Sequence, residues 1–131
     1  MKQIIQVVLF SIFLISCSTG KYYSANRSST IDPNYWNIPA DLSKIVYEGG
    51  DGSSLENAII IRNATTTRDG IAAEYAYIEK KHGQRFNEWK PMGQSTNTQN
   101  GSRYDVIIIQ ITSDNTTIKY IFDITEFYGK F

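Results

Sequence analysis

The two side-chain types that most often carry nucleophilic and general-base chemistry at neutral pH, cysteine and histidine, occur once each in this chain. Cys17 is the only cysteine and His82 the only histidine among 131 residues. A single histidine cannot build a multi-histidine zinc site, and we expect neither a metal nor a cofactor. His82 could act as a general base beside Glu74 or Glu79. A simpler interpretation is a structural one, because a histidine at the end of a helix interacts favourably with the last carbonyl groups.

A glycine-rich segment, Gly49 to Ser54, is the second place where a ligand could bind. Its sequence Gly-Gly-Asp-Gly-Ser-Ser lacks the lysine and spacing of a P-loop and the pattern of a nucleophile elbow. Asp51 and Ser53 could offer oxygens to calcium, but the alternating carboxylates and final glutamate of an EF-hand are missing. We therefore interpret the segment as a turn in which Asp51 and Ser53 bond nearby amides.

The N-terminal residues have the composition of an export signal. Lys2 supplies a positive charge, and an apolar run from Ile4 to Ile15 is interrupted only by Gln6 and Ser11. A transmembrane helix needs about 20 apolar residues, so this run is too short to span a membrane. It fits the apolar core of a signal peptide.

The residues Leu14-Ile15-Ser16-Cys17 at the end of this run resemble the lipobox of bacterial lipoproteins. The resemblance implies cleavage between Ser16 and Cys17, diacylation of the Cys17 sulfur and acylation of the new N-terminus. Two or three acyl chains together hold a protein stably in a membrane. Ser18 follows the cysteine where an aspartate could stand, and by resemblance to enterobacterial sorting this implies the outer membrane, facing the periplasm. The alternative is an ordinary secretory signal with an incidental cysteine.

Three segments follow from this division of the chain. Residues 1–16 are the expected signal peptide, and residues 17–43 carry the lipidated cysteine, a flexible polar tether and an irregular lead-in with Tyr35 and Trp36. Residues 44–131 are expected to form one domain. The chain has 13 basic and 13 acidic side chains, of which Lys2 leaves with the signal peptide. A charge so close to zero argues against a nucleic acid as partner.

The domain is predicted to contain one helix. Thr66 or Thr67 can cap its start, and Gly83 after a cationic last turn can end it, which gives a helix of about 15 residues. Short strands are predicted before it, at Ile45 to Glu48 and Ala58 to Arg62. The spacing of a buried stripe is followed by Ile71, Tyr75, Ile78 and His82, while Glu74, Glu79 and Lys81 are expected to lie elsewhere.

Two strands near the C-terminus, Tyr104 to Ile111 and Thr117 to Ile124, are predicted to form a hairpin. With Asp114 and Asn115 as a two-residue turn, Ile109 would face Tyr120. One face of the hairpin is strongly apolar. The other is mixed and too apolar for an ordinary solvated face, so we expect the N-terminal lead-in or a partner to cover it; it carries Val106, Ile108, Gln110, Lys119, Ile121 and Asp123.

The same register argues against a glycosidase. Asp105 and Asp123 fall on opposite faces of the predicted hairpin, where they could not act as a pair of catalytic carboxyl groups. Together the elements predict an α+β fold, with a single helix packed on a mainly antiparallel sheet of four to five strands. The blocks Tyr47–Ile61, Gly70–Tyr75 and Phe122–Lys130 are similar to a small uncharacterised bacterial domain family. That resemblance covers residues 45–131 and implies no activity and no site residue.

The function that these observations favour is a non-enzymatic binding module, anchored through Cys17 and facing a protein partner in the cell envelope, for example as an inhibitor or immunity factor. Its candidate binding surface consists of Asp51, Ser53, Val106, Ile108, Ile121 and Asp123. One alternative is an envelope hydrolase that uses acidic residues or His82, which should have a concave polar pocket. The other is a structural or assembly lipoprotein.

Overall fold

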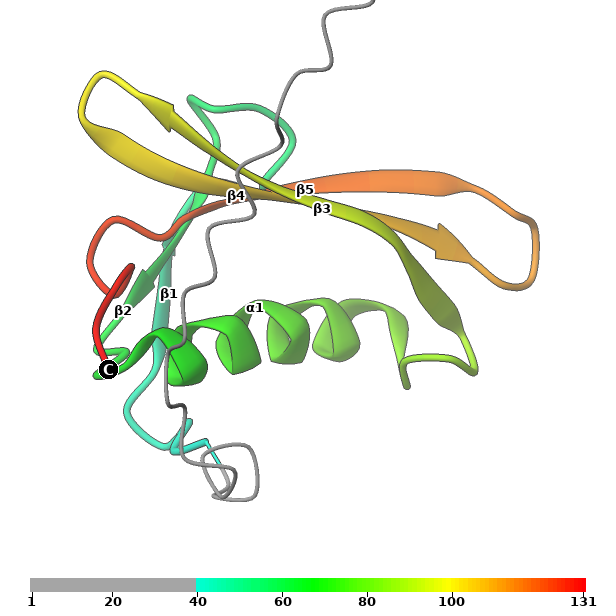
Figure 1. The fold of residues 1–131 in the computed structure, drawn as a ribbon. Coiled ribbons are helices and arrows are strands. Elements are labelled where there is room, and N and C mark those ends of the chain that lie inside the picture. Colours follow the sequence, from blue (N-terminus) through cyan, green and yellow to red (C-terminus); the bar gives the residue numbers. More distant parts are fainter. Residues whose placement is uncertain (1–39) are drawn as a thin grey trace, which may run out of the picture. The chain divides into compact units, whose positions relative to one another are not determined.

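The computed structural model describes residues 40–131. They form β1 (Val46–Gly49), β2 (Ile59–Arg62), α1 (Thr67–His82), β3 (Trp89–Gln99), β4 (Ser102–Ile111) and β5 (Thr117–Asp123). The five strands make one sheet in the order β1-β2-β5-β4-β3, and α1 lies along one side of it (Figure 1). The predicted signal peptide, Cys17, the tether and Trp36 lie outside the described residues. No helix within residues 40–131 is long and apolar enough to cross a membrane.

The α+β class and the single helix are confirmed, and the five strands fall within the predicted four to five, although β3 is a strand that the sequence analysis does not locate. The prediction of a mainly antiparallel sheet is wrong because the sheet is mixed. Three strand pairs are antiparallel, whereas β2 and β5 run parallel, with Ile59 opposite Phe122 and Ile60 opposite Asp123. The cause is the path of the chain. The helix leads from β2 to the opposite edge of the sheet, and the β3–β4–β5 meander returns beside β2 in the same direction (Figure 1).

Both ends of α1 lie where the sequence predicts them. The Thr66 hydroxyl accepts a hydrogen bond from the Asp69 N–H at 3.1 Å, as an N-cap does. At the other end the Gly83 N–H donates to the Glu79 carbonyl, and Gly83 has a φ of +92°. Local capping groups therefore determine the length of the helix.

The predicted buried face of α1 is wrong in one important respect, because Glu74 is fully buried. The buried residues of the helix are Asp69, Gly70, Ala73, Glu74 and Ile78, whereas Tyr75 is only partly buried. The face that α1 turns toward the core follows from a small residue on the helix, Gly70. A Cβ on Gly70 would lie 2.1 Å from Cε2 of Phe127, so only glycine lets the helix approach the C-terminal segment this closely.

The core lies between α1 and one face of the sheet. Its fully buried side chains come mainly from the strands and include Ile59, Ile61, Ile107, Ile109, Phe122 and Trp89. The apolar face of the predicted hairpin therefore packs against the helix. Trp89 belongs to this core and its Nε1–H donates to the Gly83 carbonyl at 2.9 Å, which fixes the start of β3 to the end of the helix.

The predicted hairpin register is wrong by two residues. Ile107 lies opposite Tyr120 and Ile109 opposite Ile118. The turn is longer than predicted: the Ile111 N–H donates to the Thr116 carbonyl at 2.8 Å, and Asn115 has a φ of +61°. Because the shift is an even number of residues, every side chain remains on the predicted face.

Candidate functional site

The face of the sheet that points away from α1 is the main candidate for function, and we call it the open face. Its side chains are recognised by cross-strand pairing: Val106 lies opposite Ile121, and Ile108 opposite Lys119. Within residues 40–131 no helix or strand covers this face. Its members include Val46, Glu48, Ile60, Arg62, Ser95, Asn97, Tyr104, Val106, Ile108, Gln110, Thr117, Lys119, Ile121 and Asp123.

Apolar side chains of the open face reach solvent. Val46 is 45% exposed and Ile108 is 37% exposed, while Ile60 and Val106 are partly buried. Ile121 is only 4% exposed, so it supports the surface without adding accessible area. The structure thus brings Val106, Ile108, Ile121 and Asp123 together on one face, as the sequence analysis groups them.

Charged side chains lie beside these apolar ones, and some of the charged side chains form ion pairs. The Arg62 guanidinium lies 3.1 Å from the Glu48 carboxylate and 3.1 Å from that of Glu126. These two carboxylates raise the pKa of Arg62, with Glu48 as the larger cause. The open face therefore has apolar positions beside a polar border of both signs.

The loop from Gly49 to Ser54 continues the sheet beside β5. The Ile121 N–H donates to the Gly52 carbonyl at 2.9 Å, and Gly52 has a φ of +83°. The Asp51 carboxylate accepts from the hydroxyl and N–H of Ser53 at 2.6 and 3.0 Å, which lowers the pKa of Asp51. The turn interpretation is confirmed for Asp51, which accepts from a backbone amide, whereas the Ser53 hydroxyl donates to the Asp51 carboxylate and not to an amide. Asp51 and Ser53 flank Gly52, which adjoins the strand that carries Ile121.

The second candidate lies at the C-terminal end of α1, around His82. Its Nε2 is 2.7 Å from the Tyr120 hydroxyl, so the hydrogen bond of this ring joins a phenol and not a carboxylate. Burial lowers the pKa of His82, and the charge of Lys81 lowers it further. The Lys81 ammonium lies 4.8 Å from the centre of the Tyr77 ring, and interaction with the Tyr77 hydroxyl is the main cause that raises the pKa of Lys81, with a smaller contribution from the charge of Asp51. The C-terminal end of α1 thus brings His82 and Lys81 near the loop that contains Asp51.

A hollow of about 410 Å³ adjoins this helix end. Its lining is polar except for one isoleucine and consists of His82, Asn87, Glu88, Ile111, Thr112 and Ser113. The carboxylates of Glu74 and Glu79 are absent from that lining, so neither general-base pairing expected from the sequence is formed at the hollow. In the described part of the chain, no group of three or more histidine, cysteine or acidic side chains could hold a metal ion.

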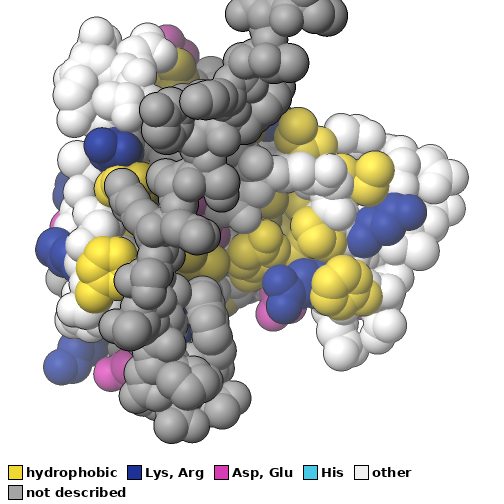
Figure 2. Space-filling view, in the orientation of Figure 1, with side chains coloured by type: hydrophobic (Ala, Val, Ile, Leu, Met, Phe, Trp, Pro, Cys, Tyr) yellow, Lys and Arg dark blue, Asp and Glu magenta, His cyan; other side chains and the backbone are white. Residues whose placement is uncertain are grey.

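Near the same end of the helix the aromatic side chain of Phe86 is exposed to solvent. Phe86 is 71% exposed and has a φ of +69°, an unusual backbone conformation for an aromatic residue. Its N–H donates to the Trp89 carbonyl at 2.6 Å, and the Arg85 guanidinium lies 4.7 Å from the Tyr75 ring. Figure 2 shows hydrophobic side chains gathered where the C-terminal half of α1 meets β3, with lysine or arginine on both sides.

Two carboxyl groups are buried under the helix, and the sequence analysis missed this arrangement. Asp105 on β4 accepts hydrogen bonds from the Gln94 amide at 2.7 Å and the Thr96 hydroxyl at 2.5 Å. Glu74 is 0% exposed, and neither of its oxygens has a hydrogen-bond partner within residues 40–131. Burial and the charge of Asp105 raise the pKa of Glu74 to about 9, so it holds a proton at neutral pH. Its burial excludes direct contact with a substrate.

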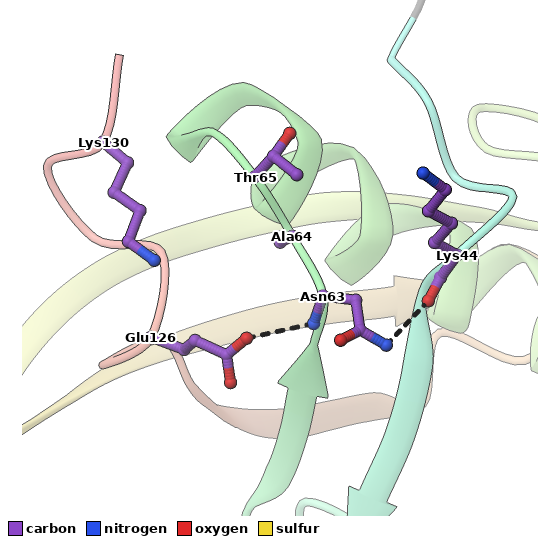
Figure 3. A pocket seen from close by; sticks show the side chains of 6 residues that line it. All are labelled: Lys44, Asn63, Ala64, Thr65, Glu126 and Lys130. Carbon is purple, nitrogen blue, oxygen red and sulfur yellow. Dashed lines mark hydrogen bonds between the residues drawn. The ribbon is translucent and has the colours of Figure 1, made fainter.

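A further hollow of about 810 Å³ lies at the N-terminal end of α1 (Figure 3). The Glu126 carboxylate accepts from the Asn63 N–H at 3.0 Å, and the Asn63 side chain donates to the Lys44 carbonyl at 3.0 Å. Figure 3 shows Lys130 pointing toward Glu126, with Lys44 on the opposite side of the hollow. These polar groups connect three distant segments, and we assign them a structural role.

No protein-family model, curated protein or solved structure matches this chain.

Proposed function

We propose that this chain is a lipid-anchored binding module of the bacterial cell envelope that recognises a protein partner without catalysis. The observation that supports this proposal best is the open face. It presents Val46 and Ile108 to solvent on a sheet whose opposite face is packed against α1. Contiguous apolar side chains on a protein surface are typical of contact sites, and here Ile108 lies on the same face of β4 as the partly buried Val106.

The composition of the open face suits such a contact. Protein interfaces have an apolar centre with aromatic residues and a polar border. Here Val106, Ile108 and Tyr104 lie on β4, the strand that pairs with both β3 and β5. Lys119 lies opposite Ile108 and Asp123 opposite Tyr104, while Arg62 lies further away on β2. A partner would therefore bury the apolar side chains of β4 and meet charged groups directly beside them.

The membrane anchor is part of the same proposal and rests on Leu14-Ile15-Ser16-Cys17. Cys17 would carry the acyl chains, and the domain would face the periplasm from the outer membrane. Metabolic labelling with a fatty acid tests this anchor. Label should be incorporated into the natural chain and absent from Cys17→Ala, and label on the variant would contradict the proposal. Protease treatment of intact cells should leave the domain uncut if it faces the periplasm.

Capture of a partner from detergent-solubilised envelope tests the binding surface. We expect a protein captured by the natural chain to be lost with Ile108→Lys, because this lysine places a charge among the apolar side chains of β4. Val46 lies opposite Arg62 on the edge strand β1, so Val46→Lys tests the border of the surface and should reduce capture less. Thr116→Lys in the exposed β4–β5 turn, outside the hollow beside His82, is the matched control and should capture normally. Unfolding temperatures close to that of the natural chain must accompany the result. Equal capture by all three variants would refute the open face as the binding surface.

The hollow beside His82 supports a second candidate function, an envelope hydrolase. Its support is the placement of an imidazole, a carboxylate and two hydroxyl groups around one hollow: His82, Glu88, Thr112 and Ser113. His82→Ala separates the two functions. Complete loss of the biological phenotype in a chain of unchanged stability and abundance would favour the hydrolase. A structural or assembly role would use the open face and would leave the His82 variant active.

A further inference from the structure

The free edge of β3 is the longest exposed strand edge within residues 40–131. β3 is the last strand in the sheet order, and it pairs with β4 without interruption from Gly93, opposite Ile108, to Gln99, opposite Ser102. Every residue of this run is exposed. We call residues 93–99 the β3 edge. Unpaired N–H and C=O groups along a regular strand are a template for another strand.

The usual protection of a strand edge is missing from the β3 edge. Proteins discourage edge pairing with charged side chains, proline, irregularities or very short edge strands. In β3 these features stand only at the beginning: Lys90, Pro91 and the register shift between Pro91 and Gly93. From Met92 to Ser102 the chain contains no charged residue and no proline. The opposite edge strand, β1, is only four residues long and carries Glu48.

Hydrogen bonds to the core hold the β3 edge in place. The Gln94 amide and the Thr96 hydroxyl both donate to the buried Asp105 carboxylate on β4. The Tyr75 hydroxyl of the helix donates to the Gln94 side chain at 3.2 Å. The strand is therefore fixed before any partner arrives, which reduces the entropy lost on binding.

We propose that the β3 edge pairs antiparallel with the β3 edge of a second copy of this chain. In a two-fold contact each stretch of chain meets the same stretch of its partner, so an edge with a net charge would meet an edge with the same net charge. The uncharged sequence of the β3 edge avoids that repulsion. A partner of a different sequence would place no such restriction on charge, and this difference favours a second copy.

Two-fold symmetry and full overlap of residues 93–99 together give the register of the proposed dimer. Two antiparallel strands in one sheet are related by an axis perpendicular to it, so residues of one face meet residues of the same face. Full overlap of residues 93–99 then centres on Thr96. Ser95 would face Asn97 of the second copy, and Gln94 would face Thr98. Both helices lie on the same side of the joined sheet, and the two open faces form one continuous surface.

Two double variants test this register, in the full chain with Cys17→Ser so that neither acylation nor a disulfide can join two copies. Ser95→Lys/Asn97→Lys places like charges opposite each other in the dimer, whereas Ser95→Lys/Asn97→Glu places opposite charges there. Both positions are exposed. Sedimentation velocity over a wide concentration range should show a dimer for Cys17→Ser alone and for the lysine–glutamate variant, and a monomer for the lysine–lysine variant at the same concentrations.

Three results would overturn the proposal. The first is a monomer at every concentration of the chain that carries only Cys17→Ser. The second is equal association of the two double variants, because association through the apolar N-terminus or the open face does not distinguish them. The third is loss of the dimer by Ile108→Lys with no effect of the lysine–lysine variant. Circular dichroism and unfolding temperature show that each variant is folded.

Discussion

The carboxyl group of Glu74 on α1 is buried beside that of Asp105 on β4, and the two groups differ in their hydrogen bonding. Asp105 accepts from Gln94 and Thr96, whereas Glu74 has no partner within residues 40–131. A buried carboxyl group without a partner avoids the cost of burying a charge by holding its proton. The helix–sheet contact therefore contains a titrating group that solvent does not reach.

The first prediction is that this proton makes the fold less stable as pH rises. In the unfolded chain Glu74 loses its proton near 4.5, but in the folded chain only near 9. Between these two pH values the folded state binds one proton more than the unfolded state. The contribution of this proton to the free energy of unfolding is therefore complete below pH 4.5 and is lost as the pH rises to 9. The slope for one such group is at most about 1.4 kcal/mol per pH unit. Urea unfolding at a series of pH values measures it.

Glu74→Gln should remove this dependence on pH, because an amide does not titrate. The matched control is Glu79→Gln, which changes an exposed glutamate on the same helix and should keep the slope of the natural chain. Parallel stability profiles for the natural chain and Glu74→Gln would contradict the assignment of a buried proton to Glu74.

The second prediction concerns the close approach of Gly70 and Phe127. In an exposed helix position, replacing glycine by alanine stabilises a helix by up to about 1 kcal/mol. Here the added Cβ would lie 2.1 Å from the Phe127 ring, so we expect Gly70→Ala to destabilise the fold by about 1 to 3 kcal/mol. Combining it with Phe127→Leu should cost less than the sum of the two single changes. Simple additivity would show that the ring is not the obstacle.

The third prediction compares two neighbouring isoleucines on opposite faces of β4. Ile109 is fully buried under the helix, while Ile108 is exposed on the open face. Ile109→Ala should cost about 2 to 5 kcal/mol because it leaves a cavity in the core. Ile108→Ala should stay within about 1 kcal/mol, since surface substitutions change stability little. Equal losses, measured by chemical unfolding, would show that the open face is covered in the natural protein.

The fourth prediction uses the single histidine as a probe of the helix end. NMR titration should give His82 a pKa below its ordinary value of 6.5, because burial and the charge of Lys81 both disfavour its protonated form. Lys81→Gln removes that charge and should raise the pKa of His82. Lys80→Gln, the exposed neighbour, is the control and should have the smaller effect. A pKa of His82 at or above 6.5 in the natural chain would contradict the described surroundings.

Features that depend on neighbouring residues could be predicted from the sequence. The ends of α1 follow from Thr66 and Gly83, which act on backbone groups of the same turn. The two faces of the C-terminal hairpin follow from strict alternation of side chains along Val106 to Ile111. The same alternation predicts that Val106, Ile108 and Ile121 share one surface, and in the structure Val106 lies opposite Ile121 and Ile108 opposite Lys119.

Features that depend on distant residues could not be predicted in this way. The orientation of α1 follows from contact between Gly70 and Phe127, which is invisible in the pattern of the helix alone, and the burial of Glu74 follows from that orientation. The sequence does not predict β3, because Pro91 and the polar residues that follow it hide the alternation of a strand. One local signal pointed to it: Asn100-Gly101, with φ of +53° and +82°, is the preferred pair for a tight hairpin turn.

The parallel pairing of β2 with β5 also determines how this domain can fold. β2 ends at Arg62 and β5 begins at Thr117. The two strands can therefore pair only after the helix, β3 and β4, which lie between them in the sequence, have been synthesised. Contacts between residues so far apart in the sequence form slowly. A chain that emerges N-terminus first therefore exposes one edge of the isoleucine-rich strand β2 until its last strand arrives. During that interval the isoleucines at positions 59–61 are the segment most prone to aggregate, and the docking of β5 ends that risk.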